Sequence, residues 1–124
     1  MTEPLALVVY EKLLPGTQLV NRLQDLKYRV KAITDASTLV DCARQEKPLI
    51  ILADVFSSRG DICQTISRLR KDRDAQHIPV IAFAADESAG LQKAARDAGA
   101  TLVVSDTAIV SHLSQFLEQA LQVE

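Results

Sequence analysis

Apolar runs and helix-period segments alternate along the whole chain of 124 residues. The apolar runs are residues 5–10, 28–33, 49–54, 79–84 and 101–105. Four of these five runs are nearly continuous in Val, Ile, Leu and Ala, which is typical of strands covered on both faces. Their starts lie 23, 21, 30 and 22 residues apart, and every gap carries apolar residues at helical spacing. This repeat predicts strands joined by helices, and therefore a parallel sheet with right-handed crossovers.

A last amphipathic stripe follows the fifth run and predicts one closing helix. It consists of Ile109, Val110, Leu113, Phe116, Leu117, Ala120 and Leu121. The predicted fold class is therefore α/β, a doubly wound (βα)5 unit that forms a single domain over residues 1–124. Gly99 is placed to end the fourth helix, and Pro15 and Gly16 fall in the first turn of the first helix.

Composition narrows the function classes. Fourteen Lys and Arg against sixteen Asp and Glu give a formal net charge of −2, which argues against a general binder of nucleic acid or anionic membranes. No apolar stretch approaches the roughly 18 residues of a membrane span, and the start of the chain lacks a signal-peptide pattern, so we expect a cytoplasmic protein. Cys42 and Cys63 form no CxxC motif and are predicted to be small buried hydrophobes, with no metal or redox role.

The carboxyl ends of the predicted strands are where an open parallel sheet binds ligands. The residues at these ends are Tyr10 to Lys12, Asp54 to Gly60, Ala84 to Asp86 and Ser105 to Thr107. Among them, Glu11 and Asp54 form a plausible oxygen pair for Mg²⁺, although two carboxylates alone are a weak signal.

Four segments together resemble the receiver (response regulatory) domain of two-component response regulators. They are "VVYEK", "KPLIILADV", "IPVIAFAAD" and "DAGATLVVSDT", and the resemblance extends from Leu5 to about Leu121. It implies a flavodoxin-like sheet with the strand order 2-1-3-4-5. It also implies that Asp54, six residues after Pro48, occupies the phosphoacceptor position.

Several functional positions of that family are changed in this chain. The resemblance places Tyr10 at the first acid of the strand 1 pair, Ala84 at the hydroxyl residue ending strand 4, and Asp106 at the lysine ending strand 5. Val103 falls at the aromatic switch position, and Ser58 falls at the proline after the phosphoacceptor. These changes indicate a degenerate, pseudo-receiver variant.

The changed residues weaken the predicted phosphoryl site. Phosphoryl transfer to Asp54 requires charge neutralisation around the transferred oxygens. Asp106 in place of a lysine removes one attraction and adds one repulsion, each on the order of 3 kcal/mol at about 5 Å and an effective dielectric near 20. Lys12 or Arg59 could act as a counter-cation, either beside a phosphoryl group or across Glu11 and Asp54 in place of the metal. We favour the second arrangement, so Mg²⁺ binding is expected to be weak or absent, and no other cofactor is expected.

Simpler interpretations of the same site residues stay open. Asp54 could be a loop carboxylate that accepts backbone hydrogen bonds, Glu11 an ordinary ion-pair partner, and Tyr10 a strand-end aromatic. Asp106 could cap the last helix, for which Ser105 and Thr107 are the other N-cap choices.

Other polar residues of the chain are predicted to lie on the surface. The basic run from Arg68 to Arg73 is predicted to be a solvated helix end rather than a nucleic-acid site, because it lacks stacking aromatics. His77 and His112 are predicted to be surface residues.

Three functional hypotheses follow. The first is a non-enzymatic signalling module that binds a histidine kinase or an output protein, with a homodimer as a further option. The resemblance implies that it uses the face of the fourth helix, fifth strand and last helix, with Gln92, Lys93, Arg96, Ser111, Gln115 and Glu118 as surface residues. The second is a weak but genuine phosphoacceptor at Asp54 that receives its phosphoryl group from a histidine kinase. The third is a flavin-type ligand binder, although the chain lacks a glycine-rich phosphate loop.

Overall fold

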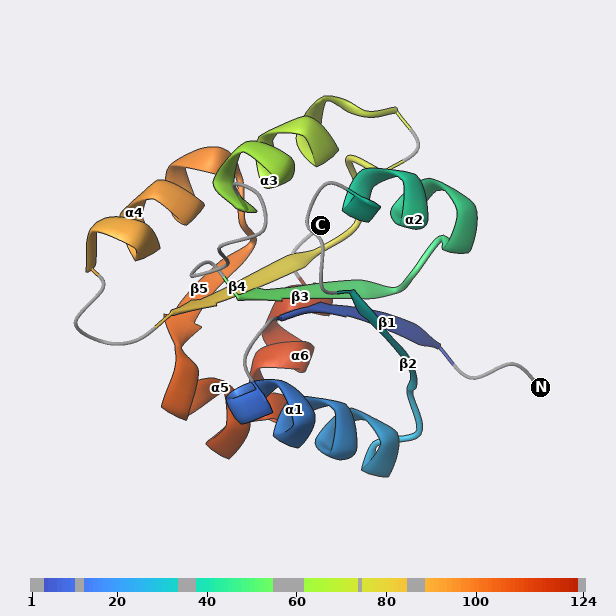
Figure 1. The fold of residues 1–124 in the computed structure, drawn as a ribbon, viewed down its shortest axis with the longest axis vertical. Coiled ribbons are helices and arrows are strands. Elements are labelled where there is room, and N and C mark those ends of the chain that lie inside the picture. The colour runs from blue at the N-terminus through green and yellow to red at the C-terminus, as the bar shows by residue number, and fades with distance from the viewer. Residues whose placement is uncertain are drawn as a thin grey trace.

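Five parallel strands form the centre of the computed structural model, which describes residues 4–10, 13–33, 38–54, 62–73, 75–84 and 89–122. The strand order is β2-β1-β3-β4-β5 (Figure 1). The strands are β1 (Leu5–Val9), β2 (Arg29–Ile33), β3 (Ile50–Asp54), β4 (Val80–Ala84) and β5 (Leu102–Ser105). Each predicted strand is present, and the predicted doubly wound sheet with order 2-1-3-4-5 is confirmed.

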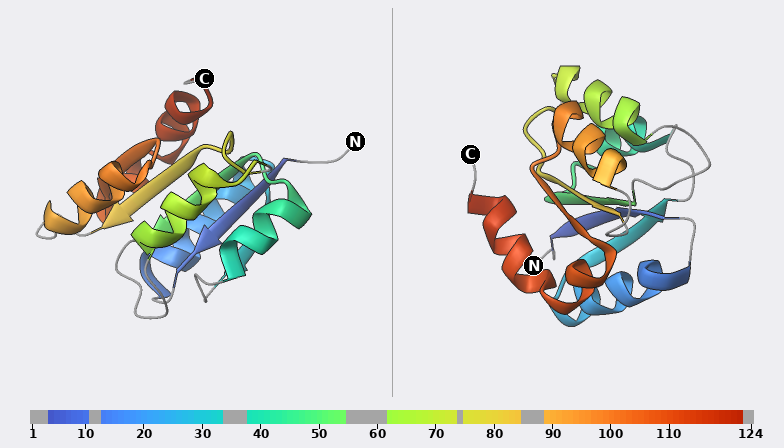
Figure 2. Two further views of the ribbon diagram at one scale, coloured as in Figure 1. Left: turned by 90° about the horizontal axis from the view of Figure 1, so that it is seen from above. Right: turned by 90° about the vertical axis from the view of Figure 1, so that its left-hand side faces the viewer.

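Helices cover both faces of the sheet (Figures 1 and 2). They are α1 (Leu13–Asp25), α2 (Leu39–Glu46), α3 (Ile62–Lys71), α4 (Ala89–Ala98), α5 (Asp106–Ser111) and α6 (Leu113–Gln122). α2, α3 and α4 lie on one face, and α1, α5 and α6 lie on the other. None of the described helices is both long enough and apolar enough to cross a membrane.

The side chains of β1 show how the two layers of core arise. Leu5, Leu7 and Val9 join the buried cluster beneath α2, α3 and α4, whereas Ala6 and Val8 join the cluster beneath α1, α5 and α6. Successive side chains on a strand point to opposite faces, so a strand covered on both sides is apolar at every position. This explains the continuous apolar runs in β1, β3 and β4, where every residue but Asp54 is apolar and all are buried.

The two outer strands are less buried. Only Ile33 of β2 is fully buried, and all four residues of β5 are half-buried. β2 lies at an edge of the sheet, where side chains such as that of Lys31 reach solvent. Its position explains why residues 28–33 form the most polar of the five runs.

The closing helix differs from the sequence prediction. Instead of one helix, the chain forms α5 and α6, with a break at His112, whose backbone angles are φ −125° and ψ 31°. Both helices still place apolar residues, including Ile109, Leu113 and Leu117, in one buried cluster. The apolar stripe therefore predicted the buried face correctly but missed the break, because a short interruption at an exposed residue leaves the spacing of the buried residues almost unchanged.

The ends of two helices agree with the positions of glycine and proline in the sequence. α4 ends at Ala98, and Gly99 has φ 116°, a value that residues with a Cβ rarely adopt. α1 begins at Leu13 and includes Pro15 and Gly16 in its first turns, as predicted.

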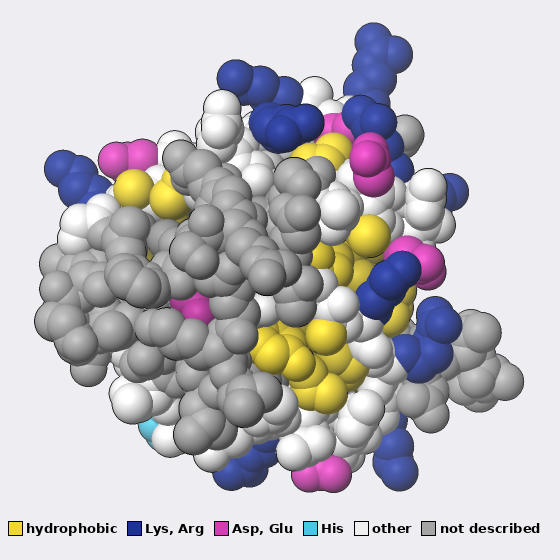
Figure 3. Space-filling model, in the orientation of Figure 1, with side chains coloured by type: hydrophobic (Ala, Val, Ile, Leu, Met, Phe, Trp, Pro, Cys, Tyr) yellow, Lys and Arg dark blue, Asp and Glu magenta, His cyan; other side chains and the backbone are white. Residues whose placement is uncertain are grey.

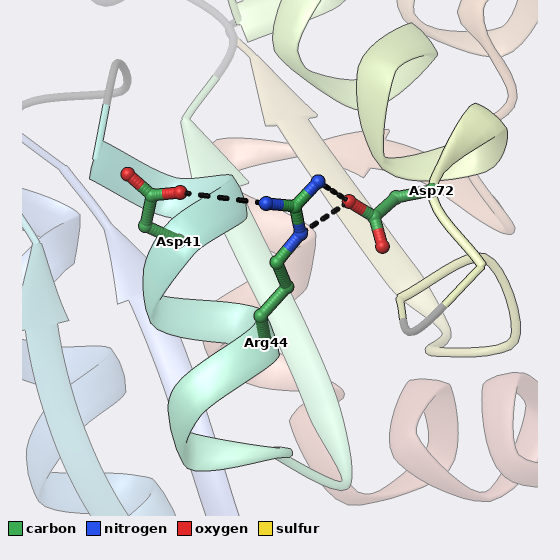
Figure 4. Close-up of polar contacts among 3 residues, drawn as sticks. All are labelled: Asp41, Arg44 and Asp72. Carbon is green, nitrogen blue, oxygen red and sulfur yellow. Dashed lines mark hydrogen bonds and ion pairs between the residues drawn. The ribbon is translucent and has the colours of Figure 1, made fainter.

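An ion pair ties α2 to the end of α3 (Figure 4). The guanidinium of Arg44 pairs with the carboxylate of Asp72, whose side chain is only 6% exposed. Nε of Arg44 also donates a hydrogen bond to Oδ2 of that carboxylate. A second carboxylate, that of Asp41, lies 3.9 Å from Nη1 of Arg44 and is largely exposed. Because Asp72 is buried, its pairing contributes more to this contact than the exposed pair does.

Candidate functional site

Asp54 ends β3 at the carboxyl edge of the sheet. Its side chain is buried, with 5% of the residue exposed, and it has an interaction partner. In the strand register Asp54 pairs with Phe83 of β4, and Val9 of β1 pairs with Ala53. Tyr10, the residue after Val9, therefore lies level with Asp54 along this edge. The structure thus brings these two predicted positions to one end of the sheet.

Ala84 ends β4, at the position where the resemblance expects a hydroxyl side chain. It is 1% exposed and lies opposite Ser105 of β5. Nε2 of Gln92, in α4, donates a 3.5 Å hydrogen bond to the backbone carbonyl of Ala84. The methyl side chain itself offers no hydrogen bond to a phosphoryl oxygen.

Tyr10 takes part in the core rather than presenting an acid at the sheet edge. It is half-buried and packs against the apolar cluster beneath α1, α5 and α6. Its backbone N–H donates to the carbonyl of Ile33 at 3.0 Å, which extends the pairing of β1 with β2 by one residue. This environment supports the interpretation of Tyr10 as a strand-end aromatic.

β5 carries the aromatic switch position at Val103, which is half-buried and packs against the cluster beneath α2, α3 and α4. β5 ends at Ser105, so Asp106 is the first residue of α5 rather than the last residue of the strand. Ser105 is the N-cap, because its side chain accepts a 3.1 Å hydrogen bond from the backbone N–H of Ala108. The suggestion that Asp106 caps this helix is therefore wrong.

Part of the predicted acidic pocket lies outside the described residues. Glu11, Lys12, Ser58 and Arg59 belong to this part, and so does the side chain of Asp106. Whether the carboxylates of Glu11, Asp54 and Asp106 lie close together, with Lys12 or Arg59 as their counter-cation, therefore stays a prediction.

A magnesium ion requires several oxygen ligands, and Asp54 is the one carboxylate among the predicted metal ligands that the structure describes. In the described ranges, no group of three His, Cys, Asp or Glu side chains could hold a metal ion. A magnesium site at this edge would thus depend on Glu11.

Cys42 lies on α2 and Cys63 on α3, whereas His77 precedes β4 and His112 separates α5 from α6. Cys42 and Cys63 are free thiols that pack against the cluster beneath α2, α3 and α4, but both are half-buried rather than fully buried as predicted. Each sits on a helix where one flank of its side chain reaches the surface. His77 and His112 are exposed, as predicted.

The basic run from Arg68 to Arg73 is only partly a solvated helix end. Arg68, Lys71 and Arg73 are exposed, but Arg70 is half-buried and Asp72 is buried. The prediction failed at these two residues. Helical spacing contains the missing signal for Arg70, since it lies four residues after the buried Ile66 and so borders the apolar stripe of α3.

Surface charge gives no sign of a basic stripe on the face that Figure 3 displays. Lys and Arg side chains are spread around the margin of the described part of that face, and Asp and Glu side chains lie beside several of them (Figure 3). This mixture is typical of an ordinary solvated surface.

Comparison with known proteins gives a fold but little sequence likeness. Neither a protein-family model nor a curated protein matches the chain. A solved structure of a candidate response regulator from Chloroflexus aurantiacus matches with a TM-score of 0.89 and 16% identity, covering 98% of this chain and 99% of that one. The receiver domain of a sensor histidine kinase from Pseudomonas aeruginosa matches at 0.87 and 21%, with the same coverage. A chemotaxis response regulator of Vibrio cholerae matches at 0.84 and 18%, over 97% of this chain and 100% of that one.

The chain has the receiver fold. Identities of 16–21% establish the fold alone, so the chemistry must be argued from the residues. The Pseudomonas receiver domain holds a magnesium ion in its active-site cleft. In the present chain the corresponding edge contains Asp54, with Ala84 at the end of the neighbouring strand.

Proposed function

We propose that this chain is a receiver-type signalling module that acts through protein binding, without efficient phosphorylation of Asp54. The observation that carries the proposal is Ala84, which ends β4 beside Asp54 with a buried methyl group in place of a hydroxyl. A phosphoryl group on Asp54 would lack one hydrogen-bond donor that could hold its oxygens. The fold supports a signalling role, and Ala84 argues against efficient phosphoryl transfer to Asp54.

The residues that would transmit a phosphorylation signal are also altered. A phosphate shifts a two-state protein only if it contacts the two states differently. Ala84 has no hydroxyl to move toward a phosphate, and the half-buried Val103 has no aromatic ring to change position. Both features support a module whose binding surface is formed without phosphate.

The proposed binding surface consists of α4, β5, α5 and α6. Five of the six residues predicted for this surface are exposed: Lys93, Arg96, Ser111, Gln115 and Glu118. Gln92, which was expected on the surface, is half-buried and hydrogen-bonds to the carbonyl of Ala84. The basic residues of this set lie on α4 and the acidic residue lies on α6, so the surface offers both signs of charge to a partner. A histidine kinase or an output protein is the proposed partner, and self-association into a homodimer is the competing outcome.

Phosphorylation can be tested directly. The purified chain is incubated with acetyl phosphate and magnesium, and its intact mass is measured beside that of Asp54→Asn. We expect no stoichiometric phosphoryl adduct on either protein. An adduct on the wild-type chain that is missing from Asp54→Asn would refute the proposal.

A gain-of-function variant sharpens this test. Ala84→Thr restores a hydroxyl at the end of β4, and Asp106→Lys restores a cation at the family's lysine position. We expect the double variant to accumulate more adduct than the wild-type chain, provided that circular dichroism shows an unchanged fold. An equally unreactive double variant would show that Ala84 and Asp106 are not what limits phosphorylation.

A weak but genuine phosphoacceptor is the second candidate. The observation that favours it is Asp54 itself, which is kept at the end of β3 in the receiver fold. Its signature would be slow labelling by a histidine kinase that Asp54→Asn abolishes.

A further inference from the structure

A groove lies at the opposite end of the sheet from Asp54, where β3, β4 and β5 begin. Its volume is about 630 Å³, within the range of about 300–1,000 Å³ that small-molecule sites occupy. The apolar residues that line it are Pro48, Leu49, Ile78, Pro79 and Leu121. Leu49 is 42% exposed, which is unusual for a large hydrophobic side chain in this protein. The groove therefore offers an apolar wall that the described part of the chain does not cover.

Arg70 also lines this groove and is held by four hydrogen bonds. Its Nε donates to the carbonyl of Gly99 at 2.8 Å, and its Nη1 donates to the carbonyls of Gln76 and Ile78, each at 2.8 Å. Its Nη2 donates to Oγ1 of Thr101 at 3.0 Å. Among the described residues no carboxylate pairs with this guanidinium, so its charge is balanced only by neutral oxygens. Burial lowers the pKa of Arg70 because it removes water from the charged form.

Arg70 and Thr101 each keep one hydrogen-bond donor for which no described residue is an acceptor. A guanidinium has five N–H groups, and the four bonds of Arg70 leave one N–H on Nη2. Oγ1 of Thr101 accepts from Arg70 and from the backbone N–H of Val80, the latter at 3.1 Å, so its own hydroxyl hydrogen is left to donate. The atoms that carry these donors lie 3.0 Å apart, and both residues line the groove. A pair of adjacent donors, one of them cationic, suits the two oxygens of a carboxylate.

We propose that this groove binds a small carboxylate with an apolar body. The apolar residues would bury the body, and the free donors of Arg70 and Thr101 would hold the carboxylate. A single negative charge matches a guanidinium that pairs with no carboxylate of the described residues, whereas a phosphate would bring more charge and more bound water to an apolar wall. The site is independent of Asp54, because the two lie at opposite ends of β3.

Octanoate is a suitable probe for this site. We titrate the full chain with octanoate and follow backbone amides and the Nε–H of Arg70 by ¹⁵N–¹H NMR. Octanol carries the same chain without the charge, octylammonium carries the opposite charge, and inorganic phosphate carries charge without the chain. We expect saturable shifts at Leu49, Ile78 and Arg70 with octanoate, and about tenfold weaker binding of octanol, since hydrogen bonds to charged groups contribute that much or more. Octanol binding as tight as octanoate, or saturable binding of phosphate alone, would overturn the proposal.

A matched pair of variants tests the same site without touching Arg70. Leu49→Glu places a negative charge on the groove wall, and Leu26→Glu places one at a leucine that is 40% exposed and does not line the groove. We expect Leu49→Glu to weaken octanoate binding at least tenfold and Leu26→Glu to leave it within about twofold. Both positions are exposed, so both variants should fold. Equal affinities for the two variants would contradict the assignment of the groove as the binding site.

Discussion

Gly99→Ala should destabilise the protein through two separate effects. The residue has φ 116°, so an added side chain is strained there whatever space surrounds it. A Cβ at this position would also lie 2.7 Å from Cγ of Arg70. That atom belongs to the stem of a side chain held by four hydrogen bonds, so it cannot move aside without breaking some of them.

The structure sets the size of this effect. Backbone strain at a left-handed position costs about 1–2 kcal/mol. Displacing Arg70 loses at least its bond to the carbonyl of Gly99, and a hydrogen bond from a charged group adds about 1–2 kcal/mol. We therefore expect the free energy of unfolding to fall by about 2–4 kcal/mol, which lowers the urea midpoint by about 1–2 M. Urea unfolding followed by circular dichroism measures both quantities.

Gly90→Ala is the matched control. Gly90 lies near the start of α4, and an added Cβ would meet no atom within 4 Å. Alanine is the better helix former, so this variant should gain about 0.5–1 kcal/mol. The reasoning fails if Gly99→Ala stays within about 0.5 kcal/mol of the wild-type chain, because strain and steric overlap together cannot be that small. In an Arg70→Ala background the overlap is removed, so a Gly99→Ala effect of undiminished size would show that the contact with Arg70 contributes nothing.

Three further predictions concern polar groups. Arg44→Met removes the ion pair with the buried carboxylate of Asp72 and should cost about 1–3 kcal/mol in urea unfolding, less than the loss of a fully buried pair because Arg44 is half exposed. Asp41→Asn, at the exposed partner, should change stability by less than about 0.5 kcal/mol. Ser105→Ala removes the N-cap of α5 and should lower the thermal stability by about 1 kcal/mol, with Ser105→Asp keeping most of it. Burial raises the pKa of Tyr28. The neutral phenol therefore stabilises the folded protein fully below about pH 10, and this contribution is lost as the pH rises through the higher folded-state pKa. Tyrosinate absorbance should therefore show one late-titrating phenol that is missing from Tyr28→Phe.

The strands could be predicted from sequence because burial on both faces leaves a strong apolar signal. The runs around Leu7, Leu52 and Ile81 contain no charged residue except Asp54 at the end of the second run, and each forms a strand within one residue of its predicted bounds. The closing helix was predicted less well. Its break at His112 depends on the backbone angles of one exposed residue, and the spacing of the buried residues carries no information about those angles.

The site was predictable only where a strand end decides the position. The pattern of apolar runs placed Asp54 and Ala84 at the ends of β3 and β4, and the structure agrees. It could not choose the cap of α5, because Ser105, Asp106 and Thr107 all have suitable side chains and only the backbone angle of Ser105 decides among them. The hydrogen bonds of Arg70 were missed for a different reason, since its four acceptors come from two separate segments, residues 76–78 and 99–101, that lie together only in the folded chain.

Arg70 connects the groove to the proposed binding surface for a signalling partner. It hydrogen-bonds to Gly99 and Thr101, which are two of the three residues joining α4 to β5. α4 and β5 belong to the proposed binding surface for a signalling partner, so a carboxylate held by Arg70 would act on the link between them. A ligand shifts such a surface only through contacts that differ between its states, and contacts made through Arg70 would not involve Asp54. Octanoate should therefore shift the amide signals of Ala100 and Leu102, and the same shifts should persist in Asp54→Asn.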